Sequence, residues 1–184
     1  MYRQAPTSPT QGSVVQAVYF DALDDEYPAV ILTPTCDIEQ HKVNFFTCVA
    51  LRPFPEMAEQ FLAGPWRDVA YEGDKRRPQL TKKQSESLEK KFRSLFSQRE
   101  PRYHWFDPWI PGGDGYVADF QLVTSVTTEE MSSLEVVAQL NSEYLEALPA
   151  RYVSYMGRIG TPDRGAEDYK EHFEKMIGRN FEIM

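Results

Sequence analysis

The residues with the clearest capacity for chemistry lie together after the second apolar run of the chain. Cys36 and Asp37 follow Thr35, and His41 comes five positions after the cysteine. A cysteine becomes a nucleophile when a nearby base such as histidine takes its proton, so Cys36 and His41 are weak catalytic candidates. Two alternatives stay open. In the first, Cys36, His41 and Cys48 are part of a metal site. In the second, the residues are structural: Cys36 ends a strand, Asp37 lies in the turn and His41 lies on the surface.

Other catalytic signatures are missing from the sequence. A structural zinc site needs about four ligands, and the remaining histidines, His104 and His172, are isolated. No glycine pattern of a phosphate loop, no serine-nucleophile elbow and no metal triad is visible by spacing. We therefore expect no metal and no cofactor, and we favour the structural interpretation of the cysteine cluster.

A second candidate is the basic segment between Lys75 and Arg102. It holds ten basic and three acidic residues, a net +7 in a chain whose total is −8, so the remainder carries −15. An aromatic run follows it, and aromatic rings beside cations form stacking platforms for single-stranded nucleic acid. A protein partner with an acidic surface, or a solvated helix with buried aromatics, explains the pattern equally well. The candidate binding residues are Lys75, Arg76, Arg77, Lys82, Lys83, Lys90, Lys91, Arg93, Tyr103, Trp105 and Trp109.

Composition limits the class of protein. The 184 residues are 41% hydrophobic and 26% charged, which is ordinary for one globular domain. No run approaches the ~20 apolar residues of a membrane span, so we expect no membrane association. The first residues have no apolar core of a signal peptide, and two cysteines fit a reducing compartment, so we expect a cytoplasmic protein. The net negative charge disfavours general affinity for nucleic acid.

The richest β-forming stretch runs from Gly12 to Pro53. It contains three runs of β-branched and aromatic residues bounded by turn residues, which predicts a small antiparallel sheet or barrel. We expect Pro28 to open the second of these strands, where its missing N–H is tolerated.

The rest of the chain alternates helical and extended patterns. Thr81 and Gln84 form a capping-box pattern that predicts the start of an amphipathic helix ending near Ser97. Pro149 is expected to kink or restart a helix that begins at Asn141. The other predicted elements are a helix over 54–64, a strand over 66–71, a basic turn over 73–78, strands over 116–126 and 134–140, and a helix over 166–177.

Two separated segments resemble the MazF/PemK family of bacterial toxins. The first reads GSVVQAVYF, then an acidic loop, then PAVILTP; the second reads VADFQLVTSVTTEEMSSLEVVAQLNSEYLEAL. The resemblance implies an α+β fold: a small, strongly twisted antiparallel β-barrel of CcdB/PemK type, with an inserted amphipathic helix and C-terminal helices. It divides the chain into a flexible N-terminus (1–11), a barrel domain (12–160) with a helical insertion at about 56–115, and a C-terminal helical extension (161–184).

The resemblance also implies where catalysis would occur. Members of the family cleave single-stranded mRNA without a metal, using an arginine just before the Pro-Ala strand and a serine or threonine after a later central strand. Here Tyr27 precedes Pro28, and the third strand ends VALRPF without a hydroxyl. Arg52 could supply charge from that side and is the remaining catalytic candidate. The acidic loop Asp21–Glu26 would repel a phosphate chain.

We therefore expect a catalytically inactive relative of these toxins. It would act as a protein-binding regulatory component of a bacterial toxin–antitoxin-like or phage-defence system, with a partner encoded nearby, and a homodimer is also compatible. One alternative is a metal-independent mRNA endoribonuclease toxin of MazF type. Another is a nucleic-acid-binding module that uses the basic insertion.

Overall fold

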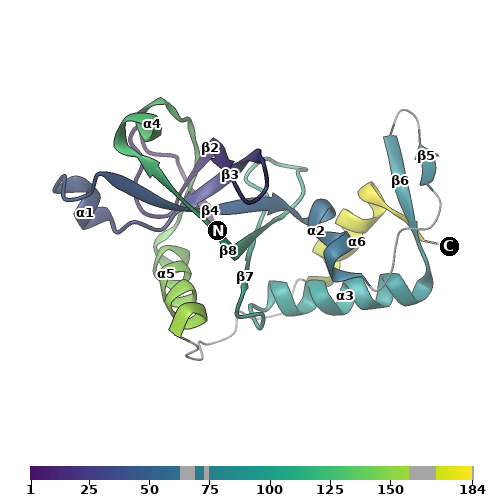
Figure 1. Ribbon diagram of the computed structural model, residues 1–184. Coiled ribbons are helices and arrows are strands. Elements are labelled where there is room, and N and C mark those ends of the chain that lie inside the picture. Colours follow the sequence, from purple (N-terminus) through teal and green to yellow (C-terminus); the bar gives the residue numbers. More distant parts are fainter. Residues whose placement is uncertain (63–68, 73–74, 158–168, 184) are drawn as a thin grey trace. The chain divides into compact units, whose positions relative to one another are not determined.

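The computed structural model describes residues 1–62, 69–72, 75–157 and 169–183, apart from the side chains of 69–72, 75, 76, 169, 171, 172 and 183. The chain forms two compact units (Figure 1). The first comprises Met1–Arg52 and Pro101–Thr161, and the second comprises Pro53–Glu100 and Pro162–Met184.

The first unit is a curled half-barrel of seven strands, which confirms the expected α+β class. Strand order is β1-β9-β2-β3-β4-β8-β7. The pairings of β1 with β9, β9 with β2, β2 with β3, β3 with β4, and β7 with β8 are antiparallel. Its elements are β1 (Tyr2–Arg3), β2 (Ser13–Phe20), β3 (Asp25–Ile31), α1 (Thr35–Glu39), β4 (Phe45–Pro53), β7 (Tyr103–Phe106), β8 (Tyr116–Thr127), α4 (Thr128–Ser133), β9 (Val136–Leu140) and α5 (Ser142–Gly157). Within the segment expected to be a flexible lead, Tyr2 and Arg3 pair with β9.

Both faces of this sheet carry buried apolar side chains. Successive residues of a strand point to opposite sides, so the same strands contribute to both faces. One face packs against α5 through Leu148, and that helix lies beside the sheet in Figure 1. The other face packs against Met131 of α4. The first cluster comprises Val14, Val30, Leu32, Val49, Leu51, Phe106, Ala118, Phe120, Ala138, Leu140 and Leu148. The second comprises Val15, Val18, Phe20, Ala29, Ile31, Phe46, Cys48, Ala50, Val126 and Met131.

The expectation that Pro28 opens a strand is wrong. β3 begins at Asp25, and Pro28 lies inside it. The register shifts between Val15 and Val18 of β2, so two residues of β2 stand opposite the proline. Ala17, one of these two, has a positive φ of 57°. Such a bulge interrupts the ladder of hydrogen bonds, which is why a residue without an N–H is tolerated there.

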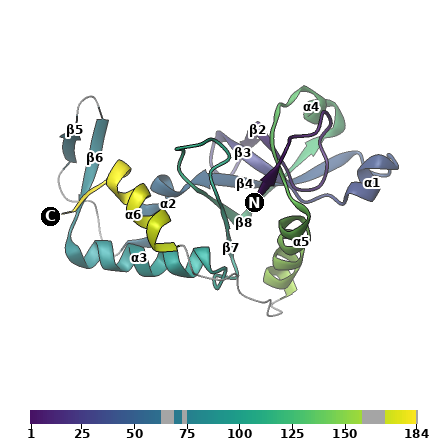
Figure 2. The ribbon, with the colours of Figure 1, turned by 180° about the vertical axis from the view of Figure 1, so that it is seen from behind.

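The second unit combines helices with a small sheet. Its elements are α2 (Phe54–Phe61), β5 (Val69–Glu72), β6 (Lys75–Leu80), α3 (Lys82–Phe96), α6 (Tyr169–Asn180) and β10 (Glu182–Ile183), with strand order β10-β6-β5. Figure 2 shows α6 crossing α3, where the rings of Phe92 and Phe173 lie 5.6 Å apart. The capping box of Thr81 and Gln84 is confirmed. The expected basic turn is wrong for residues 75–78, which pair with β5 as β6; residues 73 and 74 lie outside the described residues.

Two other expectations concern helices. α5 runs from Ser142 to Gly157 with Pro149 inside it, so the proline does not restart the helix. Residues 66–68 and 166–168, which the sequence assigns to a strand and a helix, lie outside the described residues. Among the helices of the described part of the chain, none is both long enough and apolar enough to cross a membrane.

Candidate functional site

The structure does not join the cysteine and histidine of the first candidate site. Cys36 is exposed in α1, and its Sγ lies 3.8 Å from Oδ1 of Asp37. The cysteine therefore does not end a strand, because β3 already ends at Ile31. His41 is exposed beyond the helix with a φ of 51°. No hydrogen bond links the side chains of Cys36 and His41 in the described part of the chain, so a nucleophile with its base is not assembled.

His41 instead borders a small apolar cavity of about 190 Å³. Ile38, Phe46 and Met131 line the same cavity. Cys48 is fully buried on that face of the sheet, and burial raises the pKa of its thiol to about 12. A thiol with that pKa stays protonated at neutral pH and is a poor nucleophile or metal ligand. Residues 1–62, 69–72, 75–157 and 169–183 contain no group of three His, Cys, Asp or Glu side chains placed to hold a metal ion.

Arg52 and Tyr27 are neighbours across β3 and β4. The register that pairs Ala29 with Ala50 places Tyr27 opposite Arg52. The guanidinium carbon lies 5.9 Å from the centre of the tyrosine ring, which is a cation–π contact. Nε of Arg52 is buried and makes no hydrogen bond within the described residues. The ring of Tyr27 and the guanidinium of Arg52 are therefore packed on each other.

The hairpin between β2 and β3 concentrates negative charge beside this pair. Asp21, Asp24, Asp25 and Glu26 are all exposed. The hydroxyl of Tyr19 donates a 2.6 Å hydrogen bond to Oδ1 of Asp24. This bond raises the pKa of Tyr19, with smaller contributions from desolvation and from the charges of Asp21 and Asp25. The hairpin is thus an acidic surface that favours positively charged ligands.

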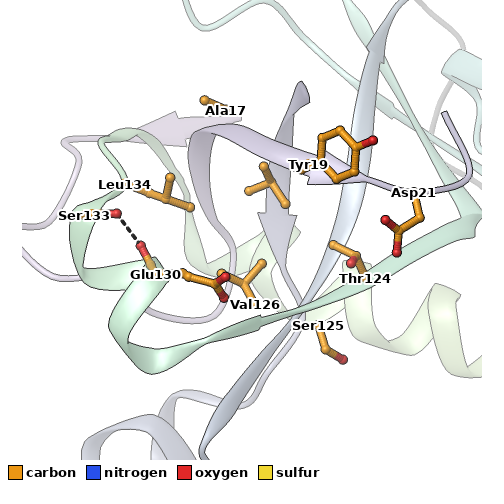
Figure 3. A pocket seen from close by; sticks show the side chains of 10 residues that line it. Ala17, Tyr19, Asp21, Thr124, Ser125, Val126, Glu130, Ser133 and Leu134 are labelled. Atoms are coloured by element: carbon orange, nitrogen blue, oxygen red, sulfur yellow. Dashed lines mark hydrogen bonds between the residues drawn. The ribbon is translucent and has the colours of Figure 1, made fainter. Parts of the chain in front are cut away.

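A larger cavity of about 400 Å³ opens next to the acidic hairpin (Figure 3). Residues of β2, the end of β8 and α4 line it: Ala17, Val18, Tyr19, Asp21, Thr124, Ser125, Val126, Glu130, Ser133 and Leu134. Its lining combines apolar side chains, four hydroxyl groups and two carboxylates, and none of these residues is basic. The cavity is suited to a ligand that is part apolar and part cationic.

Two capping interactions hold the α4 wall of this cavity in place. The backbone N–H and the hydroxyl of Thr127 both donate to Oε2 of Glu130, at 2.9 and 2.7 Å. These bonds lower the pKa of Glu130, so it is ionised at neutral pH. Ser133 donates a 2.7 Å hydrogen bond to the backbone carbonyl of Glu130 (Figure 3). Sequence reasoning missed this site, although the hydroxyl-rich run 124–128 before two glutamates was a signal of a polar strand end.

The predicted basic face is only partly available. Lys82, Lys83 and Lys90 of α3 are exposed. Lys91 forms a 3.0 Å ion pair with Glu100. Arg93 is also exposed, and its Nη2 lies 3.5 Å from Oε1 of Glu89, one turn away. Nη1 of Arg77 donates a hydrogen bond to the backbone carbonyl of Gly178 at 2.5 Å. The side chains of Lys75 and Arg76 lie outside the described residues.

The aromatic run does not form an exposed platform. Trp105 is 1% exposed, and its indole N–H donates to Asp107 at 2.9 Å. Trp109 stacks on Tyr116 with ring centres 4.0 Å apart. Tyr103 is half-buried beneath the guanidinium of Arg102 (5.0 Å). The face of Trp105 is therefore unavailable to a base, which corrects its inclusion among the binding candidates. These aromatics belong to the first unit and the cations of α3 to the second.

Comparison with known proteins gives a likeness of fold at low identity. No family model matches the chain, and no curated protein matches its sequence. A structure described as an endoribonuclease in complex with its cognate antitoxin from mycobacterial species is 9% identical, covers 84% of this chain and 100% of its own, and has a TM-score of 0.42. A MazE–MazF structure from Deinococcus radiodurans is 13% identical, covers 83% of this chain and 98% of its own, and has a TM-score of 0.40. The second carries the name of the family that the sequence resembles. Scores of this size carry no functional argument.

Proposed function

We propose that this chain is a protein-binding component of a toxin–antitoxin-like system and that it does not cleave RNA. In this role it binds a protein partner encoded nearby and regulates that partner's activity. The observation that carries the proposal is the packing of Arg52 on Tyr27, next to an acidic hairpin.

An arginine that assists RNA cleavage has to present its N–H groups to the developing charge of the phosphate. The guanidinium of Arg52 lies over the ring of Tyr27 instead, and its Nε is buried. No serine or threonine stands between Val49 and Phe54 at the end of β4. A hydroxyl that would position the ribose oxygen is thus missing from the place where the resemblance implies one.

The charge around this pair also favours a protein over RNA. Asp25 and Glu26 directly precede Tyr27 in β3 and are exposed. A phosphate chain brought to this surface would meet several exposed carboxylates, and like charges repel each other. A basic protein segment would be attracted by the same groups.

Two measurements test the proposal. First, purified protein is incubated with long single-stranded RNA, with and without a divalent metal, beside Arg52→Ala and the control Arg3→Ala. We expect intact RNA in all samples. Cleavage that Arg52→Ala abolishes and Arg3→Ala preserves would overturn the proposal in favour of an endoribonuclease.

Second, the chain is co-expressed with each protein encoded beside its gene, and complexes are isolated and weighed by light scattering. We expect one neighbour to form a complex of defined stoichiometry. A chain that stays monomeric and alone with every neighbour contradicts the proposal.

A second candidate function is nucleic-acid binding through α3, which the exposure of Lys82, Lys83 and Lys90 favours. If three lysines contact the phosphates of single-stranded RNA, their removal should reduce the slope of log K against log[salt] by about 2. Fluorescence anisotropy with labelled RNA measures this slope for K82A/K83A/K90A. The control is Lys42→Ala in the first unit, whose slope should match the wild type. Equal slopes for the triple variant and the wild type would exclude this function.

A further inference from the structure

Part of the outer edge of β2 has no hydrogen-bonded partner strand within the described residues. β9 pairs with β2 only over Ser13–Val15, and the last backbone bond runs from the N–H of Gln16 to the carbonyl of Glu135 at 3.1 Å. β2 continues to Phe20, and its partner on the other side is β3. Among the described residues, no strand pairs with the outer edge of β2 after the bulge.

The far half of β8 has a second such edge. β7 pairs with β8 over Tyr116–Asp119, and one further bond joins the N–H of Phe120 to the carbonyl of Arg102 at 3.0 Å. β8 continues to Thr127 with β4 as its other neighbour. Within the described ranges, no strand is hydrogen-bonded to the edge of β8 beyond Phe120 on the side of β7.

These two edges border the same cavity. Residues 17–19 and 21 of β2 and its turn line one side of it, and residues 124–126 of β8 line the other (Figure 3). We call this cavity the barrel seam. A strand edge without a neighbour presents N–H and C=O groups that an added strand can pair with. The seam is therefore a place where an extended segment can pair with the unpaired edge of β2 or of β8.

The side chains of the seam define the chemistry of that strand. Val18, Val126 and Leu134 supply apolar contacts, and Asp21 and Glu130 supply negative charge. The exposed hairpin acids beyond Asp21 extend the negative surface. In an extended segment, alternate residues face opposite sides, so one row of apolar and one row of basic side chains matches this lining.

We propose that the barrel seam binds an extended segment of the partner protein that alternates apolar and basic residues, and that this segment joins the sheet as an additional strand. The inference rests on the proposed function, because it specifies where and how the partner binds. Backbone pairing supplies much of the affinity, and Asp21 and Glu130 select for positive charge.

A synthetic peptide tests the seam without knowledge of the partner. The probe is a fluorescent eight-residue peptide of alternating valine and lysine, and its matched control alternates valine and glutamate. A third peptide carries the valine–lysine sequence with alternate backbone nitrogens methylated, which keeps its charge and removes half of its N–H donors. We expect anisotropy to show binding of the first peptide to the full chain and at least tenfold weaker binding of the other two. Equal binding of the methylated peptide would overturn strand addition.

Two charge variants locate the binding. Asp21→Lys reverses a charge at the seam, and Glu146→Lys makes the same change at an exposed position of α5. We expect Asp21→Lys to lower the affinity for the valine–lysine peptide about tenfold or more. We expect Glu146→Lys to leave this affinity near the wild-type value. Amide hydrogen exchange in residues 17–20 and 121–127 should slow with the peptide bound. Unchanged exchange in both segments would place the peptide elsewhere and overturn the inference.

The same variants separate this inference from the proposed function. If a neighbour-encoded protein forms its complex equally well with Asp21→Lys, the seam inference fails while the protein-binding function stands. If the peptide occupies the seam and no neighbour forms a complex, the function fails while the seam stands. Self-association in analytical ultracentrifugation that Asp21→Lys removes would assign the seam to a second copy and overturn the choice of a separate partner.

Discussion

The stability of β8, which forms one side of the barrel seam, depends on a buried carboxylate. Asp119 is 1% exposed and accepts hydrogen bonds from Nε and Nη2 of Arg102, at 2.7 and 2.5 Å. Its Oδ1 also accepts from the N–H of Gln121 at 3.0 Å. Asp119→Asn keeps one acceptor oxygen and replaces the other with an amide that faces the guanidinium. The substitution thus removes one charge-assisted bond and weakens the two that remain.

The expected loss follows from these contacts. A hydrogen bond to a charged group contributes about 1.5–3 kcal/mol, and the side chain of Arg102 is 38% exposed and can be rehydrated. We therefore expect Asp119→Asn to lower the free energy of unfolding by about 2–3 kcal/mol. For a chain of this length, that corresponds to a fall in Tm of about 6–9 °C. Thermal unfolding followed by circular dichroism measures it.

Two further variants make the reasoning refutable. Glu146→Gln changes an exposed carboxylate in the same way and should leave the Tm within about 1 °C of the wild type. Replacing both partners, as R102M/D119L, removes the ion pair without leaving a buried charge, so much of the stability should return. An Asp119→Asn protein as stable as Glu146→Gln would refute the argument.

Three other outcomes are expected. Gly115→Ala would place a Cβ 1.9 Å from the ring of Trp105, so we expect a loss of about 3 kcal/mol in chemical unfolding; near-wild-type stability would contradict this contact. Native protein at pH 8 should be alkylated by iodoacetamide at exposed Cys36 and not at buried Cys48, with mass spectrometry counting one adduct before unfolding and two after. The raised pKa of Tyr19 means that its bond to the neighbouring aspartate stabilises the fold at neutral pH and that this contribution is lost as pH rises through the folded-state pKa. The stability difference between wild type and Tyr19→Phe should therefore vanish in alkaline urea titrations, and a difference independent of pH would refute it.

The elements that the sequence predicts well are those set by local patterns. The run of β-branched and aromatic residues in Ser13–Phe20 and the capping box of Thr81 and Gln84 depend on neighbours in the chain, and both the strand and the cap are present. The surroundings of Pro28 and Pro149 were less predictable. Whether a strand accepts Pro28 depends on the strand paired with it, and whether a helix continues through Pro149 depends on the packing of the whole helix. Pro28 is accepted since β2 bulges opposite it. Pro149 is accepted within α5, where Leu148 is buried against the sheet.

The candidate site likewise has features that residue types predict and features that only the folded sheet reveals. The resemblance implied that Tyr27 stands where an arginine is expected and left Arg52 as a weak catalytic candidate, and the antiparallel register places these two residues opposite each other. The barrel seam could not be predicted, because it forms between residues about a hundred positions apart when the sheet curls. The sequence shows the acids and hydroxyls of the seam, but not which strand edges lack a hydrogen-bonded partner.

The interleaved path of the chain has a consequence for synthesis on the ribosome. The second unit is completed late: Phe173 packs on Phe92, and Glu182 and Ile183 pair with Gln79 and Leu80. About eighty residues separate α3 from these late segments, and at roughly 5–20 residues per second their translation takes about 4–16 s. During that interval α6 has not yet been synthesised, so it does not cover the apolar side of α3. The strands of the first unit are already being made. Co-translational folding should therefore finish the half-barrel first, with a time window in which nascent α3 is open to chaperones.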